Sequence, residues 1–554
     1  MVKDTLASID HTKFTYLFLF ISVLLIIIYS VFGFNLKYTI GNDLVGYIEE
    51  AKNSLMGIGF SRTPWGLVPI DDAPRPGRLF PIGYPFFLSV ALYLGLSAEL
   101  FVKIVNIASW FLLIPATIWS TKRLFSRDVS VLIALYVVSS PALVFTVFNT
   151  GPDIPSLLLV VLATGLIFNS IYSRRVSTML VAGLIVSIYY SFRNSATAII
   201  LSIVVSHVLA YLFKVFSLKE VMVRLFLFFV GVAPLVIVLV VRNLTMFEEL
   251  QPYNVKVLED VSLIASYRVV LNSILIDITG LEKVAHLVAW DYKLILILII
   301  IFAYPCYRAL KVIMERKDDV QIFTILYILS FIGASVSMLM IAHSYWGLDR
   351  GYLLRHVLPF GWLLCVFIAL ILKEWDDLKR YRAEYVLPIL LVTLSFGHIL
   401  FASDDFLREK KALSNIKQIN IDDKLKTVSS DINYRHQIKK MFAKDQTLIN
   451  IVKNIEGDAF IASNQGSFLR YITDRPVRNF GFGNITNLFP VLDGKVDYES
   501  KILEKRPIYY IILVSNELLR KEVRWKEYVK LNLPQRYSIY SELKNAIIFR
   551  NKVN

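Results

Sequence analysis

Cysteine is scarce in this chain, with only Cys306 and Cys365 among 554 residues. Both lie in long apolar runs, and the segment 403–554 contains none, so a disulfide framework is excluded there. No Cys/His cluster has the spacing of a zinc site. The sequence also lacks a Walker loop, a GxGxxG after a predicted strand and a GxSxG elbow. These absences leave nucleotide-driven chemistry without support.

Charged residues are also few, at 19%, whereas 56% of the residues are hydrophobic. This balance excludes an ordinary soluble globular protein. Apolar runs recur from Phe14 to Phe401, and about 20 apolar residues suffice for a helix to cross a bilayer. We therefore predict a polytopic α-helical membrane protein with about 11 transmembrane helices. They are expected at residues 14–34, 101–121, 129–148, 154–172, 177–192, 196–214, 222–241, 292–313, 321–342, 354–372 and 384–402.

Clusters of Lys and Arg indicate which loops are cytoplasmic. These clusters are Lys122, Arg123 and Arg127; Arg174 and Arg175; Lys214, Lys219 and Arg224; Lys311, Arg316 and Lys317; and Lys373, Lys379, Arg380 and Arg382. With them inside, we expect a cytoplasmic N-terminus in the plasma (inner) membrane and an extracytoplasmic segment after residue 402. The loops 149–153, 193–195, 242–290 and 343–353 then face outward.

The apolar run 79–96 breaks this alternation if it is counted as a crossing. It is short and contains Pro81, Gly83 and Pro85, so we interpret it as a juxtamembrane or re-entrant helix, which is tolerated when packed within protein. With this choice Asp43 and Asp153 both face outward. A true crossing places them on opposite sides.

The C-terminal segment 403–554 has a different pattern and is basic, with 27 Lys/Arg against 18 Asp/Glu. Alternating strand and helix patterns predict a soluble α/β domain that handles the acceptor or serves as a scaffold. The predicted elements are strands at GDAFIASNQ, RPVRNF and PIYYIILVS, helices at GSFLRYIT and YESKILEKR, and a hairpin at YSIYSELKNAIIFRN. The positive charge suits anionic lipid headgroups or a phosphorylated substrate, with a merely solvated surface as the alternative. Nucleic acid is not expected as a partner.

An acidic segment follows the first predicted transmembrane helix. Asn42 or Asp43 can cap a helix whose last turn ends at Gly57. The helix face that we expect toward a cleft carries Asp43, Tyr47, Glu50, Ala51 and Ser54. The face that we expect in the membrane interface carries Leu44, Ile48 and Leu55. The alternative for Asp43 is an ordinary helix cap.

Further polar residues are predicted on the same side of the membrane. Asp153, in FNTGPDIPSLL, directly precedes a transmembrane helix, and capping of that helix is its alternative role. Arg350, Arg355 and His356 border the outward loop 343–353, where Arg can fork two donors onto phosphate oxygens. Arg193 and Arg242 also face outward. Membrane anchoring is the alternative for these cations.

Several short motifs, in this order along the chain, resemble GT-C membrane glycosyltransferases that use dolichyl- or undecaprenyl-phosphate sugars. These motifs are Asp43…Tyr47…Ala51…Gly57-Ile-Gly59-Phe60, Pro81-Ile-Gly83-Tyr84-Pro85, Asp153, Arg193 in SFRNSA, Arg242-Asn243 and Arg355-His356-Val357-Leu358-Pro359. The likeness is to the protein mannosyltransferase and aminoarabinose transferase kind. His356 replaces the usual aromatic residue. The central loop lacks a WWD-type signature, which argues against the oligosaccharyltransferase branch.

The resemblance implies a GT-C-like catalytic domain over 1–402, with external loops at 35–100 and 242–290, followed by the domain 403–554. Such an enzyme moves a sugar from a polyprenyl phosphate to a hydroxyl of a glycolipid, polysaccharide or protein, with inversion. For an enzyme of this kind we predict the following roles for single residues. Asp43 is the general base, and Asp153 orients the acceptor, holds the base or binds a divalent cation (Mg or Mn). The donor phosphate is bound by Arg350, Arg355, His356, Arg193 and Arg242. The substrate is contacted by Tyr47, Glu50 and Tyr84.

Two other functional classes stay open at this point. A transporter or flippase of lipid-linked saccharides shares the spans and the outward cations. It should, however, show internal repeats and broken helices at mid-membrane depth, and no repeat of the 14–121 block is visible. A non-catalytic scaffold with an exported domain does not need outward Asp and Arg residues gathered on the membrane half.

Overall fold

The structure is a computed structural model of the chain. It describes residues 11–35, 42–63, 74–77, 81–148, 151–250, 262–281, 318–346, 350–374, 388–400, 445–457, 459–463, 466–479, 509–514, 537–543 and 546–551, with six isolated positions between 282 and 317. The predicted span 292–313, the predicted helix YESKILEKR and the linker 403–444 therefore lie essentially outside the described residues.

The chain divides into two compact units. The helical unit comprises Met1–Asn35, Arg78–Phe87 and Leu96–Asp405. The loop–sheet unit comprises Leu36–Gly77, Leu88–Gly95 and Phe406–Asn554. Residues of the predicted first external loop thus share one unit with the predicted C-terminal domain.

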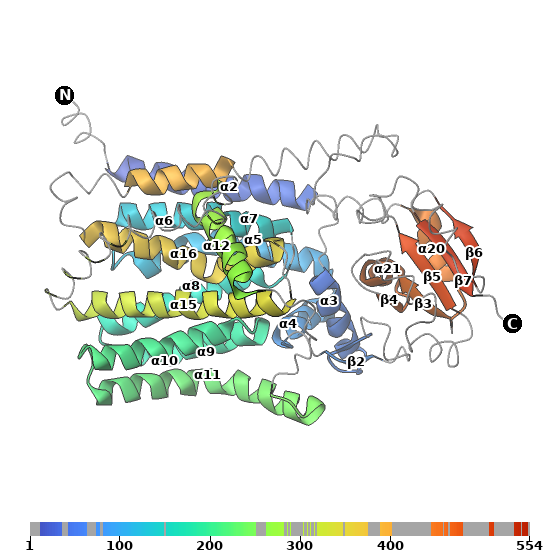
Figure 1. Ribbon diagram of the computed structural model, residues 1–554, viewed down its shortest axis with the longest axis horizontal. Coiled ribbons are helices and arrows are strands. Elements are labelled where there is room, and N and C mark those ends of the chain that lie inside the picture. Colours follow the sequence, from blue (N-terminus) through green and yellow to red (C-terminus); the bar gives the residue numbers. More distant parts are fainter. Residues whose placement is uncertain are drawn as a thin grey trace. The chain divides into compact units, whose positions relative to one another are not determined.

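Helices that lie side by side make up the helical unit (Figure 1). α9 packs against both α8 and α11, α5 packs against α6 and α8, and α15 packs against α10 and α16. The helices are α2 (His11–Asn35), α5 (Ala98–Thr121), α6 (Arg127–Ser139), α7 (Pro141–Phe148), α8 (Asp153–Tyr172), α9 (Thr178–Phe192), α10 (Ala196–Leu212), α11 (Leu218–Phe247), α12 (Leu263–Thr279), α15 (Asp319–Trp346), α16 (Arg350–Glu374) and Pro388–Leu400.

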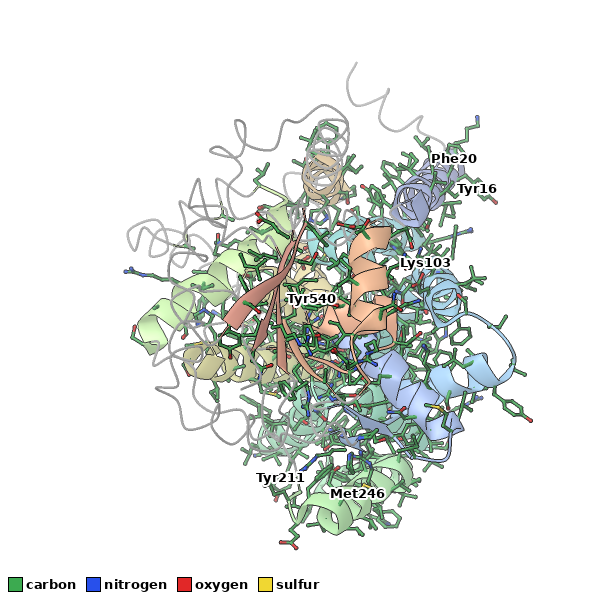
Figure 2. All side chains as sticks on the ribbon, turned by 90° about the vertical axis from the view of Figure 1, so that its right-hand side faces the viewer. Tyr16, Phe20, Lys103, Tyr211, Met246 and Tyr540 are labelled. Atoms are coloured by element: carbon green, nitrogen blue, oxygen red, sulfur yellow. The ribbon has the colours of Figure 1, made fainter. Side chains whose placement is uncertain are left out.

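The outer surface of the helical unit is apolar. Tyr16 and Phe20 on α2, Tyr211 on α10 and Met246 on α11 are exposed and project from the helices (Figure 2). Within the described residues, α5, α8, α11, α15 and α16 are long and apolar enough to cross a membrane. Soluble monomers rarely expose so much apolar surface, so these features agree with the predicted multi-pass membrane protein.

One predicted span is interrupted. Residues 129–148 were expected to form one helix, but α6 ends at Ser139 and α7 begins at Pro141. Ser140 between them has ψ 134°, which is extended backbone. The cause is local, because the ring of a proline disfavours the helical conformation of the residue before it.

Both predicted external segments contain a helix. In the segment 35–100, α4 (Gly83–Tyr93) has 11 residues, about half of what a crossing requires, in agreement with a juxtamembrane or re-entrant helix at 79–96.

In the segment 242–290, which was predicted to be an external loop, α12 packs against α15 and α16.

The loop–sheet unit contains a five-stranded sheet in the order β4-β3-β5-β7-β6. β3 is parallel to β4 and β5, whereas β7 is antiparallel to β5 and β6. The strands are β3 (Phe460–Ser463), β4 (Val477–Asn479), β5 (Tyr509–Val514), β6 (Tyr537–Glu542) and β7 (Ala546–Asn551). α20 (Gln446–Asn454) and α21 (Gly466–Thr473) pack apolar side chains into its core. All five strands and α21 lie where the sequence patterns predict strands, a hairpin and a helix.

Glu456, which precedes β3, contacts side chains of β5 and β7. Its carboxylate accepts a hydrogen bond from the Tyr510 hydroxyl at 2.6 Å and lies 3.0 Å from the Arg550 guanidinium. The Tyr510 hydroxyl, and to a lesser degree Arg550, hold the pKa of Glu456 below its ordinary value. This contribution to stability is present above the ordinary pKa of a glutamate and is lost as the pH falls through the lowered one.

α9 and α11 approach each other unusually closely. A Cβ added to Gly183 would overlap the carbonyl oxygen of Phe228, and one added to Gly231 would overlap that of Leu180. Gly333 on α15, in contrast, has no atom within 4 Å of an added Cβ. The glycines on α9 and α11 are therefore needed for backbone contact, and Gly333 is not.

We expect Gly183→Ala to lower the free energy of unfolding by about 1–3 kcal/mol, because the new methyl group forces two packed backbones apart. Gly333→Ala is the matched control. Its expected effect is neutral or stabilising by up to about 1 kcal/mol, from helix propensity alone. Thermal unfolding of the purified protein in detergent measures both, and equal effects of the two substitutions contradict the packing argument.

Candidate active site

An ion pair between Asp153 and Arg193 lies at one end of the helical unit. Asp153 is in the first turn of α8, and Arg193 follows the last residue of α9. These helices form an antiparallel hairpin through residues 173–177, so the start of one lies beside the end of the other. Nη1 of Arg193 donates to Oδ1 of Asp153. The shared end agrees with the predicted alternation of loops.

Both charges suit their positions. The N-terminus of a helix stabilises a carboxylate and the C-terminus stabilises a cation, because the peptide dipoles align along the axis. The Asp153 side chain is 5% exposed and that of Arg193 is 12% exposed. Charges buried to this degree are tolerated only when they are paired. The pair therefore fixes the two helix ends to each other.

His356 adds a third polar group to the pair. It lies on α16, and its Nε2 is 3.4 Å from Nη2 of Arg193. A guanidinium only donates, so this ring nitrogen is the acceptor and the ring hydrogen is on Nδ1. The structure thus brings together three predicted site residues, Asp153, Arg193 and His356. Arg355 directly precedes His356 in the chain.

Tyr84 lies close to the same helix end. Its ring contacts the Phe192 ring edge-on, with the centroids 5.5 Å apart. Gly83 rests on Ser191, and a Cβ added to this glycine would overlap the serine hydroxyl and carbonyl oxygens. The Pro-Ile-Gly-Tyr-Pro segment is thereby held against the end of α9, one residue before Arg193. Tyr84 is almost fully buried, which favours a supporting role over direct contact with a substrate.

The other carboxylates of the prediction belong to the loop–sheet unit. α3 (Asn42–Leu55) forms as expected, with Asp43 half-buried in its first turn and Gly57 in a left-handed conformation after its end. However, the expected orientation with one face in the membrane interface is wrong in part. Leu44 and Ile48 are buried in protein, as are Tyr47, Glu50 and Ala51 on the opposite face, whereas Leu55 is exposed.

Glu50 is enclosed in the first loop. Its carboxylate oxygen Oε1 lies 3.6 Å from Nε of Arg62, and neither side chain has more than slight exposure. The backbone of Gly77 covers the carboxylate so closely that a Cβ would overlap it. Tyr47 is also buried. These positions favour a role for Tyr47 and Glu50 in holding the loop, and their predicted contact with substrate stays untested.

Two predicted cations are placed less fully. Arg350 begins α16, but its side chain lies outside the described residues. Arg242 is in the last turns of α11, where it donates to Asn243 Oδ1 at 3.2 Å and lies over the Phe247 ring. The proximity of Arg242 to the Asp153 pair therefore stays a prediction.

Asp277 on α12 is a buried carboxylate that is not among the predicted site residues. Its Oδ1 accepts from the Ser140 hydroxyl and, at 3.0 Å, from the backbone N–H of Ala142. It thereby caps the start of α7 at the break in the predicted span. His398 lies beside it, with Nδ1 3.2 Å from the Ser139 hydroxyl and Nε2 3.0 Å from the Ile278 carbonyl oxygen. A lone Asp in the run NSILIDITG and an internal Ser-Pro pair are the sequence signals of this cluster.

The described residues do not fit a divalent cation held by protein ligands. In the part of the chain that the structure describes, no three His, Cys, Asp or Glu side chains gather in a way that could hold a metal ion. Asp153 already has a guanidinium on Oδ1. The chemistry proposed below therefore uses protein side chains alone.

No protein-family model matches the sequence, and no curated protein matches it. Solved structures do. The oligosaccharyltransferase of Archaeoglobus fulgidus, in complex with Zn and sulfate, has a TM-score of 0.53 at 12% identity, over 95% of this chain and 73% of its own. ArnT from Cupriavidus metallidurans has a TM-score of 0.53 in the apo state and 0.52 bound to undecaprenyl phosphate. The two ArnT structures are 11% and 10% identical to this chain, and each is covered over 98% of its length.

The fold is GT-C. The resemblance found in the motifs is thus confirmed at the level of the fold. The first of these known proteins is an oligosaccharyltransferase, and the second binds undecaprenyl phosphate. Because both branches share the fold, the expectation against the oligosaccharyltransferase branch rests on the sequence alone.

We expect Arg193→Ala to lower the free energy of unfolding by about 3–5 kcal/mol, since it leaves a buried carboxylate without its cation. Lys311→Ala is the matched control, because it removes an exposed ion pair with Glu315 and should cost less than about 0.5 kcal/mol. A double-mutant cycle of Arg193→Ala with Asp153→Asn isolates the coupling. Additive losses in that cycle contradict the pairing.

For Asp277, the expected loss depends on the acceptor oxygen. Asp277→Ala leaves the Ser140 hydroxyl and the Ala142 N–H without their partner and should cost at least about 2 kcal/mol. Asp277→Asn keeps the oxygen and should cost less. Thermal unfolding compares the two variants, and equal losses argue against the capping role.

Proposed function

We propose that the protein transfers a sugar from a polyprenyl-phosphate carrier to a hydroxyl acceptor at the non-cytoplasmic face of the plasma (inner) membrane. The observation that supports this most is the GT-C fold along 98% of the chain, shared with ArnT in complex with undecaprenyl phosphate. In this proposal the N-terminus is cytoplasmic and the C-terminal segment is extracytoplasmic. The acceptor is a glycolipid, a polysaccharide or a protein.

The donor phosphate needs fixed positive charge as it leaves. Arg193 and Arg355 supply it in this proposal, and His356, next to Arg355 in the chain, accepts a hydrogen bond from Arg193. Arg350 begins α16, and the unpaired N–H groups of a helix start also favour an anion. Arg242 is the least supported member of the set. Prearranged cations of this kind stabilise charge that develops in the transition state.

Asp43 is the general base of this proposal. As the acceptor oxygen forms its bond to the anomeric carbon, its proton passes to the Asp43 carboxylate. The bond between that carbon and the phosphate oxygen breaks, and the phosphate keeps the electron pair. Attack opposite to the leaving group inverts the anomeric centre. Asp153 acts through Arg193, because the ion pair holds the guanidinium in place.

The test is transfer of radiolabelled sugar from polyprenyl-phosphate donors in membranes that contain the wild-type protein or single variants at equal abundance. Asp43→Asn should reduce transfer by about 10²–10⁴-fold, which is the usual contribution of a general base. Asp153→Asn should also reduce it, with a loss of stability. The exposed Asp474→Asn is the matched control and should transfer at the wild-type rate.

Wild-type rates for Asp43→Asn exclude it as the base. Absence of transfer by the wild-type protein across a panel of donors and acceptors contradicts the proposed activity. In that case, protein-dependent movement of the lipid-linked sugar across vesicles would support the transporter class instead.

A further inference from the structure

Within the loop–sheet unit, α3 and α21 are joined by polar contacts among Glu49, Thr63 and Arg470. Oε1 of Glu49 accepts from both the backbone N–H and the hydroxyl of Thr63, each at 2.7 Å. Nη1 of Arg470, on α21, is 3.3 Å from Oε2 of Glu49 and 3.0 Å from the Thr63 carbonyl oxygen. Each of the three residues thus contacts the other two. Two of them belong to the first loop and one to the C-terminal segment.

These contacts are largely shielded from water. The side chains of Arg470 and Glu49 are 7% and 18% exposed. A buried guanidinium must keep its partners, because an isolated charge is strongly disfavoured in a low-dielectric interior. Arg470 also donates to a backbone carbonyl, so it constrains the main chain as well as a side chain. The arrangement therefore has one favourable geometry.

A second ion pair joins the same two segments but differs in environment. Nζ of Lys52, on α3, is 3.4 Å from Oδ1 of Asp474, which directly follows α21, and the side chains are 49% and 81% exposed. Exposed pairs of this kind are screened by solvent and contribute little. The position of α3 against α21 thus depends on Arg470 far more than on Lys52.

Glu49 and Asp43 are on one helix. They are six residues apart, which corresponds to about 9 Å along a helix. A short helix moves as a body, so the contact that fixes Glu49 also fixes where Asp43 points. A displacement of about 1 Å of a reacting group can cost about 10²-fold in rate.

We infer that Arg470 is a positioning residue, through which the C-terminal segment holds α3 and with it Asp43. The catalytic part of this inference rests on the proposed function, whereas the mechanical part does not. The C-terminal segment is then a working component of the transferase. No contact of Arg470 with substrate is implied.

The experiment uses the full-length protein in membranes and two readouts. Hydrogen–deuterium exchange measures the protection of α3, and sugar transfer measures kcat and KM for the donor. Arg470→Ala should raise exchange in α3 by about tenfold or more and lower kcat by about 10–100-fold, with the donor KM changed less than about threefold. Arg470→Lys should partly restore both. Lys52→Ala is the matched control and should change neither by more than about twofold.

Unchanged protection of α3 in Arg470→Ala overturns the inference whether or not transfer is detected. Wild-type kcat in Arg470→Ala, together with loss of transfer in Asp43→Asn, also overturns it. Wild-type transfer in Asp43→Asn overturns the base assignment alone, and the exchange data still decide whether Arg470 holds α3. If Arg470→Ala does not fold, Glu49→Gln serves in its place, since it keeps the acceptor for Thr63 and removes the charge that Arg470 meets.

Discussion

A charged group that is removed from water needs a partner, and this constraint determines where the buried charges of this structure lie. The buried and partly buried carboxylates lie against a donor or a cation: Asp153 against Arg193, Asp277 against Ser140 and the start of α7, and Glu49 against Arg470. Most of these contacts are made where helices begin or end. Helix ends carry backbone groups that have no partner within the helix, so a charged side chain there satisfies the backbone and finds its own counter-charge together.

This constraint connects the fold to the chemistry proposed for it. A bundle of apolar helices offers few places for polar groups, and a charged group costs the least free energy at a helix end. The Asp153–Arg193–His356 group joins the α8–α9 hairpin to α16, which lies far along the chain. Such a group is rigid because each member lies on, or directly after, a packed helix. Rigid cations are what a departing phosphate requires, since they need no reorganisation during the reaction.

Much of the fold could be predicted because the signals are local. The length of apolar runs predicts α5, α8, α11, α15 and α16, and alternation predicts the strands of the sheet. Loop counting alone predicted that Asp153, Arg193 and His356 lie at the same end of the helices, and the structure brings them together. Pairings over long sequence distances could not be predicted, since a single sequence does not show which Ser meets Asp277 or which Arg meets Glu49. Periodicity also could not show that protein covers residues on both faces of α3, such as Ile48 and Tyr47.

The contact between Thr63 and Arg470 joins residues that are 407 positions apart in the chain. At about 5–20 residues per second, a ribosome needs about 20–80 s to make the intervening segment. For that time the first loop exists without the guanidinium that later holds it, while the helices between them are still entering the membrane. The contacts of Arg470 with Glu49 and Thr63 are thus among the last to form in the biogenesis of this protein. A chain that stops before α21 keeps its membrane helices but lacks the part that closes on the first loop.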